Sequence, residues 1–282
     1  MPDTQTIDEQ QTPPTADFGP VVVFDGVSVG FEGRTVLDNI SFTVEPGEQR
    51  VIFGPAGTGK SVLLKLVDGL LRPDSGSIKV FGQAIEHMRE VDLFKLRARI
   101  GMVFQESALF DSLTVEDNVA YRLHEDGVPP EEAHTRAIQA LKFSALENAE
   151  AKFPSELSGG MRRRASIARA IVTGPDLILY DSPTGGLDPI TSTTIVELVV
   201  KQRDVSHTTS LLITHRLQDA FTLATHRFNL DENRMQPIEK AHNSGIDPST
   251  KFLILNEGKV VFDGKTEDLV CSQDPWLKQY LA

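Results

Sequence analysis

A glycine-rich segment with one lysine and one serine is the part of the chain whose residue types and spacing most clearly indicate chemistry. Residues 54–61 read GPAGTGKS and match the pattern G-x-x-x-x-G-K-[ST]. In such a loop the backbone N–H groups turn toward phosphate oxygens, the lysine adds positive charge at the β- and γ-phosphates, and the serine hydroxyl can bind Mg²⁺. The segment predicts a nucleoside triphosphate site made of Gly54, Pro55, Ala56, Gly57, Thr58, Gly59, Lys60, Ser61 and Val62.

Two later segments could serve the same nucleotide. Residues 157–161 (LSGGM) open a stretch whose apolar residues have helical spacing, with Ser158 as the expected N-cap. A helix start of this kind can hold an anion, although by itself the pattern is more often an ordinary capped loop. Residues 177–181 (LILYD) form a short apolar run that ends in a carboxylate. A buried parallel strand would deliver Asp181 to Mg²⁺ in this way.

The elements that position these residues follow from the flanking sequence. The first glycine loop lies between an apolar run that ends at Phe53 and another that begins at Val62. This order predicts the strand, loop and helix that a phosphate-binding loop requires. The region from Val21 to Phe53 has short β-rich runs separated by Asp-Gly and Pro-Gly turn signals, which predict an antiparallel sheet before the first core strand.

Five motifs in this order resemble the ATP-binding subunit of ABC transporters: residues 54–61, 157–161 and 177–181, then 186–189 (GLDP) and 211–215 (LLITH). The resemblance runs from about Val21 to Gly264. It implies an α/β fold with a P-loop NTPase (ABC ATPase) core, an inserted helical lobe and a small antiparallel β-subdomain. It also implies that the cofactors are ATP and Mg²⁺.

The same resemblance implies a role for each matched position. Lys60 and Ser61 would bind the phosphates and Mg²⁺, and Gln105 would sense Mg²⁺ and a transmembrane partner. The remaining implied positions are the signature residues Ser158, Gly159 and Gly160, the Mg²⁺-orienting Asp181, the D-loop residue Asp188 and the switch histidine His215. Phe31 falls where the family stacks an aromatic ring on adenine, and a core or hairpin phenylalanine is an equal alternative.

Position 182 departs from the family pattern. The residue after the Mg²⁺-orienting aspartate is usually a glutamate that polarises the attacking water, and here it is Ser182. Positioned general-base catalysis is worth about 10²–10⁴ in rate, so its simple loss would raise the barrier by roughly 3–5 kcal/mol. ATP binding should be nearly unaffected. Three interpretations remain open: slow hydrolysis supported by His215 and a water held by Ser182, a base placed elsewhere, and an ATP-dependent switch that hydrolyses little.

The residues in and around these motifs narrow the resemblance to one subgroup of the family. Residues 105–121, the methionine of LSGGM, the arginines behind it and residues 187–192 (LDPITS) resemble the Mla/Mkl-type ATPases, which energise phospholipid movement together with subunits that carry MCE domains. This implies transmembrane permease subunits and an MCE-type subunit as partners, and a place at the cytoplasmic face of the inner membrane. It further implies a head-to-tail dimer with ATP between Lys60 of one chain and residues 158–160 of the other. A chain with two anion-binding helix starts for one nucleotide fits such a composite site.

Composition agrees with a cytosolic motor domain. The chain has 282 residues and a net charge of −12, which argues against a non-specific nucleic-acid binder. One cysteine, Cys271, excludes an internal disulfide framework. No apolar run approaches the ~18 residues of a membrane helix. Soluble ATPases of DNA repair or translation usually have long coiled-coil insertions or two fused cassettes, which this chain lacks.

Four segments are expected outside the core motifs: a disordered tail at 1–20, a helical lobe at about 103–173, a surface-loop insertion at about 228–250, and a C-terminal tail at 265–282. The insertion precedes an expected hairpin at 252–262. Within the lobe, the apolar residues of the segment 109–115 could form either the groove for a transmembrane partner or the core of the lobe. Arg162, Arg163, Arg164 and Arg169 could raise the local positive potential or pair with a partner, and for at least two of them a solvated helix face is favoured.

Overall fold

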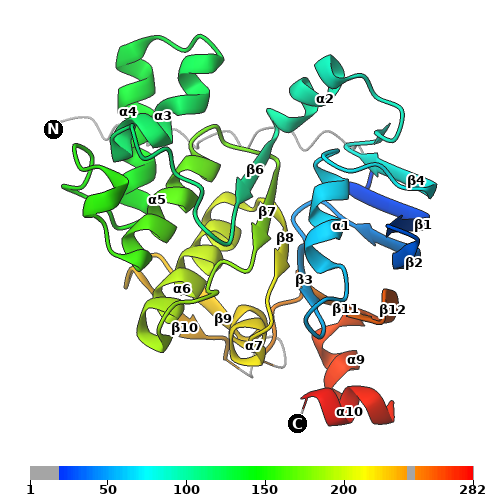
Figure 1. Cartoon of the computed structure of the whole chain (residues 1–282). Helices are drawn as coiled ribbons and strands as arrows, with labels where there is room; N and C mark the ends of the chain where they lie inside the picture. Colours follow the sequence, from blue (N-terminus) through cyan, green and yellow to red (C-terminus); the bar gives the residue numbers. More distant parts are fainter. Residues whose placement is uncertain (1–18, 240–244, 282) are drawn as a thin grey trace, which may run out of the picture.

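A six-stranded sheet forms the centre of the computed structural model, which describes residues 19–239 and 245–281 (Figure 1). Its strand order is β12-β11-β3-β8-β7-β6. The strands are β3 (Gln49–Phe53), β6 (Ile100–Val103), β7 (Leu177–Asp181), β8 (Thr209–Ile213), β11 (Thr250–Asn256) and β12 (Lys259–Lys265). All neighbours are parallel except β12, which pairs with β11 as the expected hairpin. The carboxyl ends of β3, β7 and β8 therefore meet at one edge.

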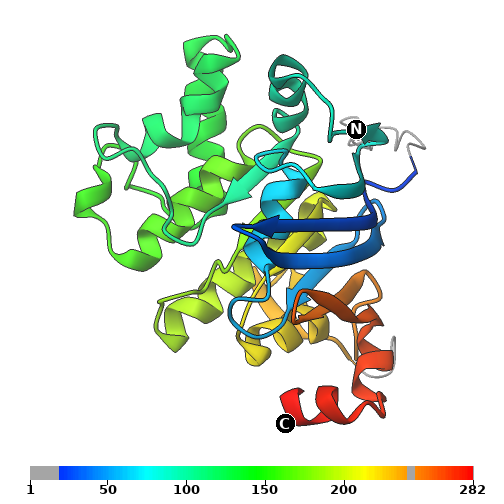
Figure 2. The ribbon, with the colours of Figure 1, turned by 45° about the vertical axis from the view of Figure 1, so that its right-hand side comes forward.

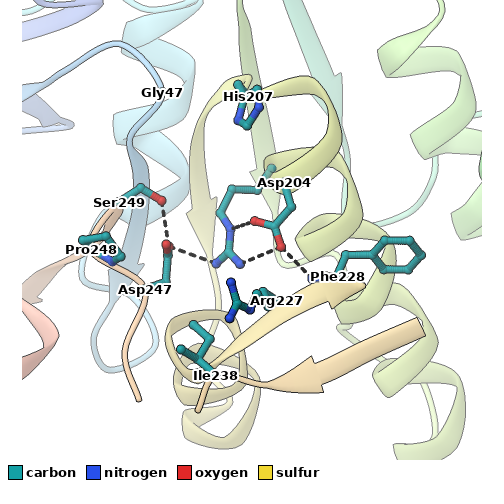
Figure 3. Close-up of a pocket in the computed structure, with 10 residues that line it drawn as sticks. Gly47, Asp204, His207, Arg227, Phe228, Ile238, Asp247, Pro248 and Ser249 are labelled. Atoms are coloured by element: carbon teal, nitrogen blue, oxygen red, sulfur yellow. Dashed lines mark hydrogen bonds and ion pairs between the residues drawn. The ribbon is translucent and has the colours of Figure 1, made fainter. Parts of the chain in front are cut away.

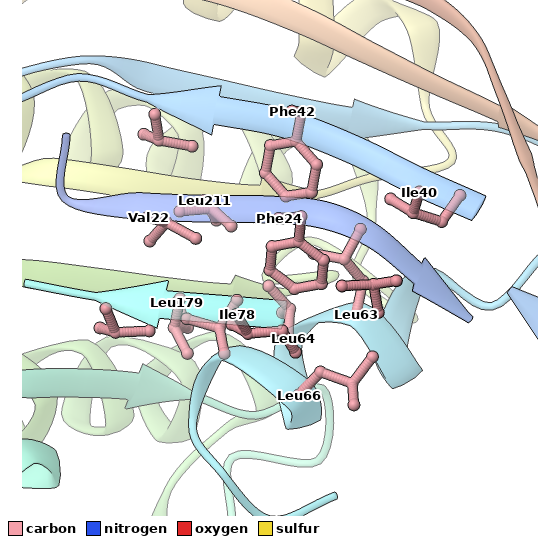
Figure 4. Close-up of a cluster of buried hydrophobic side chains, with 14 of the residues drawn as sticks. Val22, Phe24, Ile40, Phe42, Leu63, Leu64, Leu66, Ile78, Leu179 and Leu211 are labelled. Carbon is pink, nitrogen blue, oxygen red and sulfur yellow. The ribbon is translucent and has the colours of Figure 1, made fainter. Parts of the chain in front are cut away.

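A second sheet, antiparallel as the sequence predicts, covers one face of the centre. Its order is β2-β1-β4-β5, with β1 (Val22–Phe31), β2 (Arg34–Val44), β4 (Ser75–Val80) and β5 (Gln83–Ala84). Helix α1 (Lys60–Val67) lies between the two sheets, and its leucines share one core with Phe24 and Phe42 of the antiparallel sheet and with Leu179 and Leu211 of the central sheet (Figure 4). The buried leucines of α1 thus fix the helix that follows the phosphate loop.

The helical lobe has a hydrophobic core of its own. It contains α3 (Val115–Glu125), α4 (Pro130–Phe143), the short 3₁₀ helix η1 (Pro154–Glu156) and α5 (Gly159–Ile171), while α2 (Glu90–Arg97) precedes β6. Helices α3, α4, η1 and α5 occupy the segment at about 103–173 in which the sequence predicts a helical lobe. In Figures 1 and 2 the lobe, drawn in green, stands apart from the antiparallel sheet, drawn in blue and cyan.

The opposite face of the central sheet is covered by α6 (Pro189–Ser206), α7 (Leu217–Thr225) and α5. The C-terminal segment also contributes here, because it forms α9 (Thr266–Val270) and α10 (Pro275–Leu281) instead of a simple tail. The ring of Trp276 stacks on Tyr280 at a centroid distance of 4.8 Å, and Tyr280 lies 5.3 Å from Phe53. Apolar burial of Leu269 and Leu277 against the core explains why the segment is ordered.

The insertion at 228–250 differs from the predicted surface loop. Strand β9 (His226–Asn229) pairs with β10 (Arg234–Pro237) in a two-stranded antiparallel sheet. The hairpin is held because Phe228 is buried beside α6 and Met235 packs on the same core. Residues 240–244 of the insertion lie outside the described residues, as do residues 1–18 of the predicted N-terminal tail.

A cavity of about 360 Å³ lies where the insertion meets the amino ends of β3, β8 and β11 (Figure 3). This edge of the sheet is opposite the one that bears the phosphate loop. Arg203 binds Asp204 at 2.7 Å and Asp247 at 3.1 Å beside the cavity. The two carboxylates are thus already paired with one arginine, which ties the insertion to α6.

Candidate functional site

The phosphate loop of residues 54–59 connects β3 to α1, as its sequence predicts. Two of its glycines are required by the space around them. Gly54 has φ 148°, and a Cβ there would lie 2.2 Å from the carbonyl oxygen of Leu255. Gly59 has φ 88°, and a Cβ there would lie 2.7 Å from Leu37. The loop therefore presents backbone N–H groups at the start of α1, where an anion is favoured.

Lys60 is folded back onto the loop that it follows. Its Nζ donates to the carbonyl oxygens of Gly54 at 2.9 Å and Pro55 at 2.6 Å. Burial lowers the pKa of Lys60, and the carboxylate of Asp181 partly opposes this shift. A phosphate in the loop would offer the ammonium stronger, charged acceptors than two carbonyl groups.

Two of the three residues predicted to bind Mg²⁺, Ser61 and Asp181, meet at the end of β7. Ser61 Oγ donates to Asp181 Oδ1 at 3.1 Å, so a hydroxyl and a carboxylate that are 120 residues apart in sequence lie in direct contact. Gln105 follows β6, the neighbour of β7, and its side chain lies beside Gly185. Mg²⁺ prefers such oxygen ligands and usually completes its shell with water and substrate phosphates. The donor set fits that ion.

Ser182 occupies a tight turn at the end of β7. It has φ 48° and is only 7% exposed, and its N–H donates to Ile213 O at 3.0 Å. A nearby buried carboxylate, Asp219 of α7, is already engaged, since it accepts from Thr184 Oγ1 at 2.5 Å and pairs with Arg216 at 3.5 Å. Asp219 therefore holds the loop after Ser182 in place.

The switch position and the adenine position both lie at the surface. His215 follows β8 and is exposed at the same edge of the sheet as the phosphate loop. Phe31 ends β1 and is 43% exposed, so its ring is not part of the core. An exposed ring next to the Glu32–Gly33 turn remains accessible to a stacking partner.

The signature segment begins α5 as predicted, with Ser158 as its N-cap: Ser158 Oγ accepts from Met161 N at 3.2 Å. The two glycines differ in their surroundings. A Cβ at Gly159 would meet only Leu187, at 3.7 Å, whereas a Cβ at Gly160 would lie 2.4 Å from Thr191. Gly159 is thus open toward the outside, and Gly160 is fixed against α6.

The two predicted anion sites do not come together within one chain. Helix α1 packs with Leu177, Leu179 and Leu211 on one face of the central sheet. Ile167 and Ala170 of α5 pack on the other face, with Ile178 and Tyr180. Because alternate residues of a strand point to opposite faces, α1 and α5 lie on opposite sides of the sheet.

The expectation of a solvated arginine face is wrong. None of the four arginines is exposed, and each donates to at least one backbone carbonyl. Arg162 and Arg164 bind Leu157 O and Ala145 O, whereas Arg163 and Arg169 reach the segment that contains Gln105. Sequence reasoning missed these contacts because the bonded carbonyls are up to 62 residues away.

The segment at 109–115 contributes to both the lobe core and the surface. Val115 is buried in the lobe. Phe110 is 44% exposed, and its ring lies 4.7 Å from that of Tyr121. On α2, Phe94 is also exposed and packs under the guanidinium of Arg122. We call the exposed rings of Phe94, Phe110 and Tyr121 the aromatic patch.

Comparison with known proteins gives consistent matches. Residues 37–185 match the family model described as ABC transporter. The chain is 36% identical over 250 residues to the intermembrane phospholipid transport system ATP-binding protein MlaF of Haemophilus influenzae, covering 88% of this chain and 85% of that protein. It is 33% identical over 264 residues to Mkl of Mycobacterium tuberculosis, named as a probable ribonucleotide transport ATP-binding protein, covering 93% of this chain and 67% of that protein.

Solved structures agree with the fold. The cassette MJ0796, solved as a dimer in a post-hydrolysis state with ADP and phosphate, matches with a TM-score of 0.71 and 27% identity, over 86% of this chain and 98% of that chain. CbiO1 of Clostridium perfringens, part of the CbiONQ transporter complex, matches with a TM-score of 0.75 and 25% identity, over 90% and 92%. The predicted fold class is confirmed. In the part of the chain that the structure describes, no helix has both the length and the apolar composition needed to span a membrane.

Proposed function

The chain belongs to the ABC transporter ATP-binding family, and we propose that it is the ATPase subunit of a transporter that moves phospholipid in a cell envelope. Membership makes it a nucleotide-binding, ABC-type ATPase and the ATP-binding subunit of a transporter. The observation that carries the choice of phospholipid is the 36% identity to MlaF over 88% of the chain.

The ATP site is composite and forms between two copies of the chain. Lys60, Ser61 and Asp181 lie at one edge of the central sheet, and α5 begins on the other side of that sheet. The free space at Gly159 supports this arrangement, because a phosphate of the opposite chain could approach the start of α5 there. MJ0796, solved as a dimer, has the same fold.

Each residue at the edge has a distinct part in this arrangement. The ammonium of Lys60 exchanges the carbonyls of Gly54 and Pro55 for the β- and γ-phosphates. Ser61 Oγ and the carboxylate of Asp181, which already lie within hydrogen-bond distance of each other, would hold Mg²⁺, with Gln105 as a further ligand. Bound Mg²⁺ would neutralise charge on the transferred phosphoryl group. His215 faces the same edge and orients the attacking water or the γ-phosphate.

The aromatic patch is the docking surface for a transmembrane permease at the cytoplasmic face of the membrane. Three exposed rings on α2, α3 and the segment before α3 form an apolar surface near the segment that carries Gln105. A helix from a membrane partner would bury these rings, and an MCE-type subunit would join through that partner. No nucleic acid takes part, in keeping with the net charge of −12.

A second candidate function is an ATP-dependent switch with little hydrolysis. The observation that favours it is Ser182, which supplies no base at the position after Asp181. The nearby carboxylate of Asp219 does not replace that base, because it already binds Thr184 and Arg216. Such a chain would close on ATP and reopen by slow release or exchange of nucleotide.

Steady-state phosphate release from the purified chain, with and without its co-purifying membrane partner, separates the motor from the switch. For the motor, we expect Mg²⁺-dependent release that rises with the partner. Phosphate release no faster than that of a Lys60→Ala control, both with and without the partner, would show that the chain acts as the switch. The cargo is tested by ATP-dependent transfer of a fluorescent phospholipid between vesicles that contain the complex, and absence of transfer despite ATP hydrolysis would contradict phospholipid as the cargo.

A further inference from the structure

Arg163 is a buried cation that none of the roles above uses. It lies on α5, is 4% exposed, and has no carboxylate partner within ion-pair distance among the described residues. Its Nη1 donates to Phe104 O and its Nη2 to Gly185 O at 3.3 Å, while its Nε–H has no acceptor in the described part of the chain. Burial of a guanidinium against only two carbonyl groups is costly, so a compensating role is expected.

The two carbonyls belong to the two loops that carry the predicted chemistry. Phe104 immediately precedes Gln105, and Gly185 lies between Ser182 and the D-loop residue Asp188. These loops also contact each other, because a Cβ at Gly185 would lie 3.6 Å from the Cγ and Nε2 atoms of Gln105. Arg163 therefore joins the loops at the place where the glutamine side chain rests.

The other arginines of α5 do not duplicate this contact. Arg169 donates to Ala108 O at 2.6 Å and to Ser107 O at 3.0 Å, and so holds only the loop that follows Gln105. Arg164 donates to Ala145 O at 2.6 Å, within the helical lobe. Among the four, Arg163 alone donates to the loop after Ser182.

We propose that Arg163 is a positioning residue that keeps Gln105 and the loop at 182–188 in a fixed relation, so that a movement of the helical lobe displaces both together. The planar guanidinium suits this role, because its two Nη groups can bind two carbonyls at once. The proposal rests on the proposed function, in which Gln105 is a ligand of Mg²⁺. Loss of Arg163 should therefore weaken the Mg²⁺ site without weakening the phosphate loop.

The test is the Mg²⁺ dependence of ATP binding to the full chain. For Arg163→Met we expect the Mg²⁺ concentration at half-maximal effect to rise about tenfold, the lower end of the loss seen when a supporting partner of a metal ligand is removed. ATP affinity in EDTA should stay unchanged. Arg164→Met is the matched control, with the same substitution on the same helix, and should leave the Mg²⁺ dependence as in the parent.

A double-mutant cycle with Gln105→Ala tests whether Arg163 acts through the glutamine. Removing both side chains should cost about as much in Mg²⁺ dependence as removing Gln105 alone. Additive effects, or equal behaviour of Arg163→Met and Arg164→Met, would overturn the proposal. Should Arg163→Met unfold, Arg163→Lys serves, because one ammonium reaches one carbonyl at a time and should give an intermediate shift. Failure of the ATP site itself would appear separately, as undiminished ATP affinity in Lys60→Ala.

Discussion

Replacement of Ser182 by glutamate tests whether the chain lacks a catalytic base. The backbone at this position has φ 48°, and serine already bears the cost of that conformation, so glutamate adds little new strain. No hydrogen bond from Ser182 Oγ is present among the described residues, so the substitution breaks none. The added carboxylate would lie at the end of β7, on the residue that directly follows Asp181.

The expected gain follows from the value of a positioned base. General-base catalysis is worth about 10²–10⁴ in rate, and a grafted base is seldom ideally placed, so we expect kcat for Ser182→Glu to rise by up to about 10², or ~2.7 kcal/mol. ATP affinity should fall only slightly, from the added charge near the γ-phosphate. The assay is steady-state phosphate release combined with equilibrium ATP binding.

Ser182→Gln is the matched control, because it has nearly the size of glutamate and cannot take a proton at neutral pH. Equal rates for the two variants would show that side-chain size, not basicity, caused any gain. If the parent already hydrolyses ATP as fast as Ser182→Glu, another residue supplies the function and the reasoning is refuted. His215→Ala in the parent would then identify the switch histidine as that residue if activity is lost.

Three further changes have defined outcomes. Lys60→Ala should reduce Mg-ATP affinity by about 100-fold in equilibrium titration, since it removes the charged donor of the loop; unchanged affinity would disprove the site. Gly159→Val should leave ATP binding by the monomer intact, because Leu187 is 3.7 Å from the new Cβ, but reduce the dimer fraction on sizing in Mg-ATP; a dimer fraction equal to the parent's would disprove the composite site. Burial raises the pKa of Asp68 to about 6, and the charge of Arg97 opposes this shift. The neutral carboxyl therefore contributes to the free energy of unfolding. This contribution is fully present below pH ~4 and is lost as the pH rises through about 6. Asp68→Asn should make the free energy of unfolding, measured with urea, less dependent on pH between about 4 and 6. A pH dependence equal to that of the parent would contradict the assignment.

Local patterns were sufficient for the phosphate loop and for the strand ends. The glycines before Lys60 and the apolar runs on both sides specify a strand, a loop and a helix within about twenty residues, and Asp181 follows a short apolar run whose length is typical of a buried strand. The hairpin at 226–237 and helix α10 also left signals: Phe228 and Met235 flank a turn-forming Asp-Glu-Asn segment, and aromatic residues four positions apart mark one helix face.

Arg163 shows where such reasoning stops. Its helical position is consistent with either an exposed or a buried side chain, and the hydrophobic pattern of α5 does not say which loops will cover it. The bonded carbonyls of Phe104 and Gly185 lie 59 and 22 residues away and carry no side-chain signal of their own. Only the packing of the lobe against the central sheet brings these groups together.

The aromatic contacts of α10 give the chain an intrinsic optical reporter. Trp276 is the single tryptophan, and through Tyr280 it is connected by two ring contacts to Phe53, the residue before the phosphate loop. The tryptophan fluorescence therefore originates from one place, connected through Tyr280 to the strand that leads into the phosphate loop. A nucleotide titration of the unlabelled protein, in wild-type sequence and at low concentration, could be followed through this one emitter.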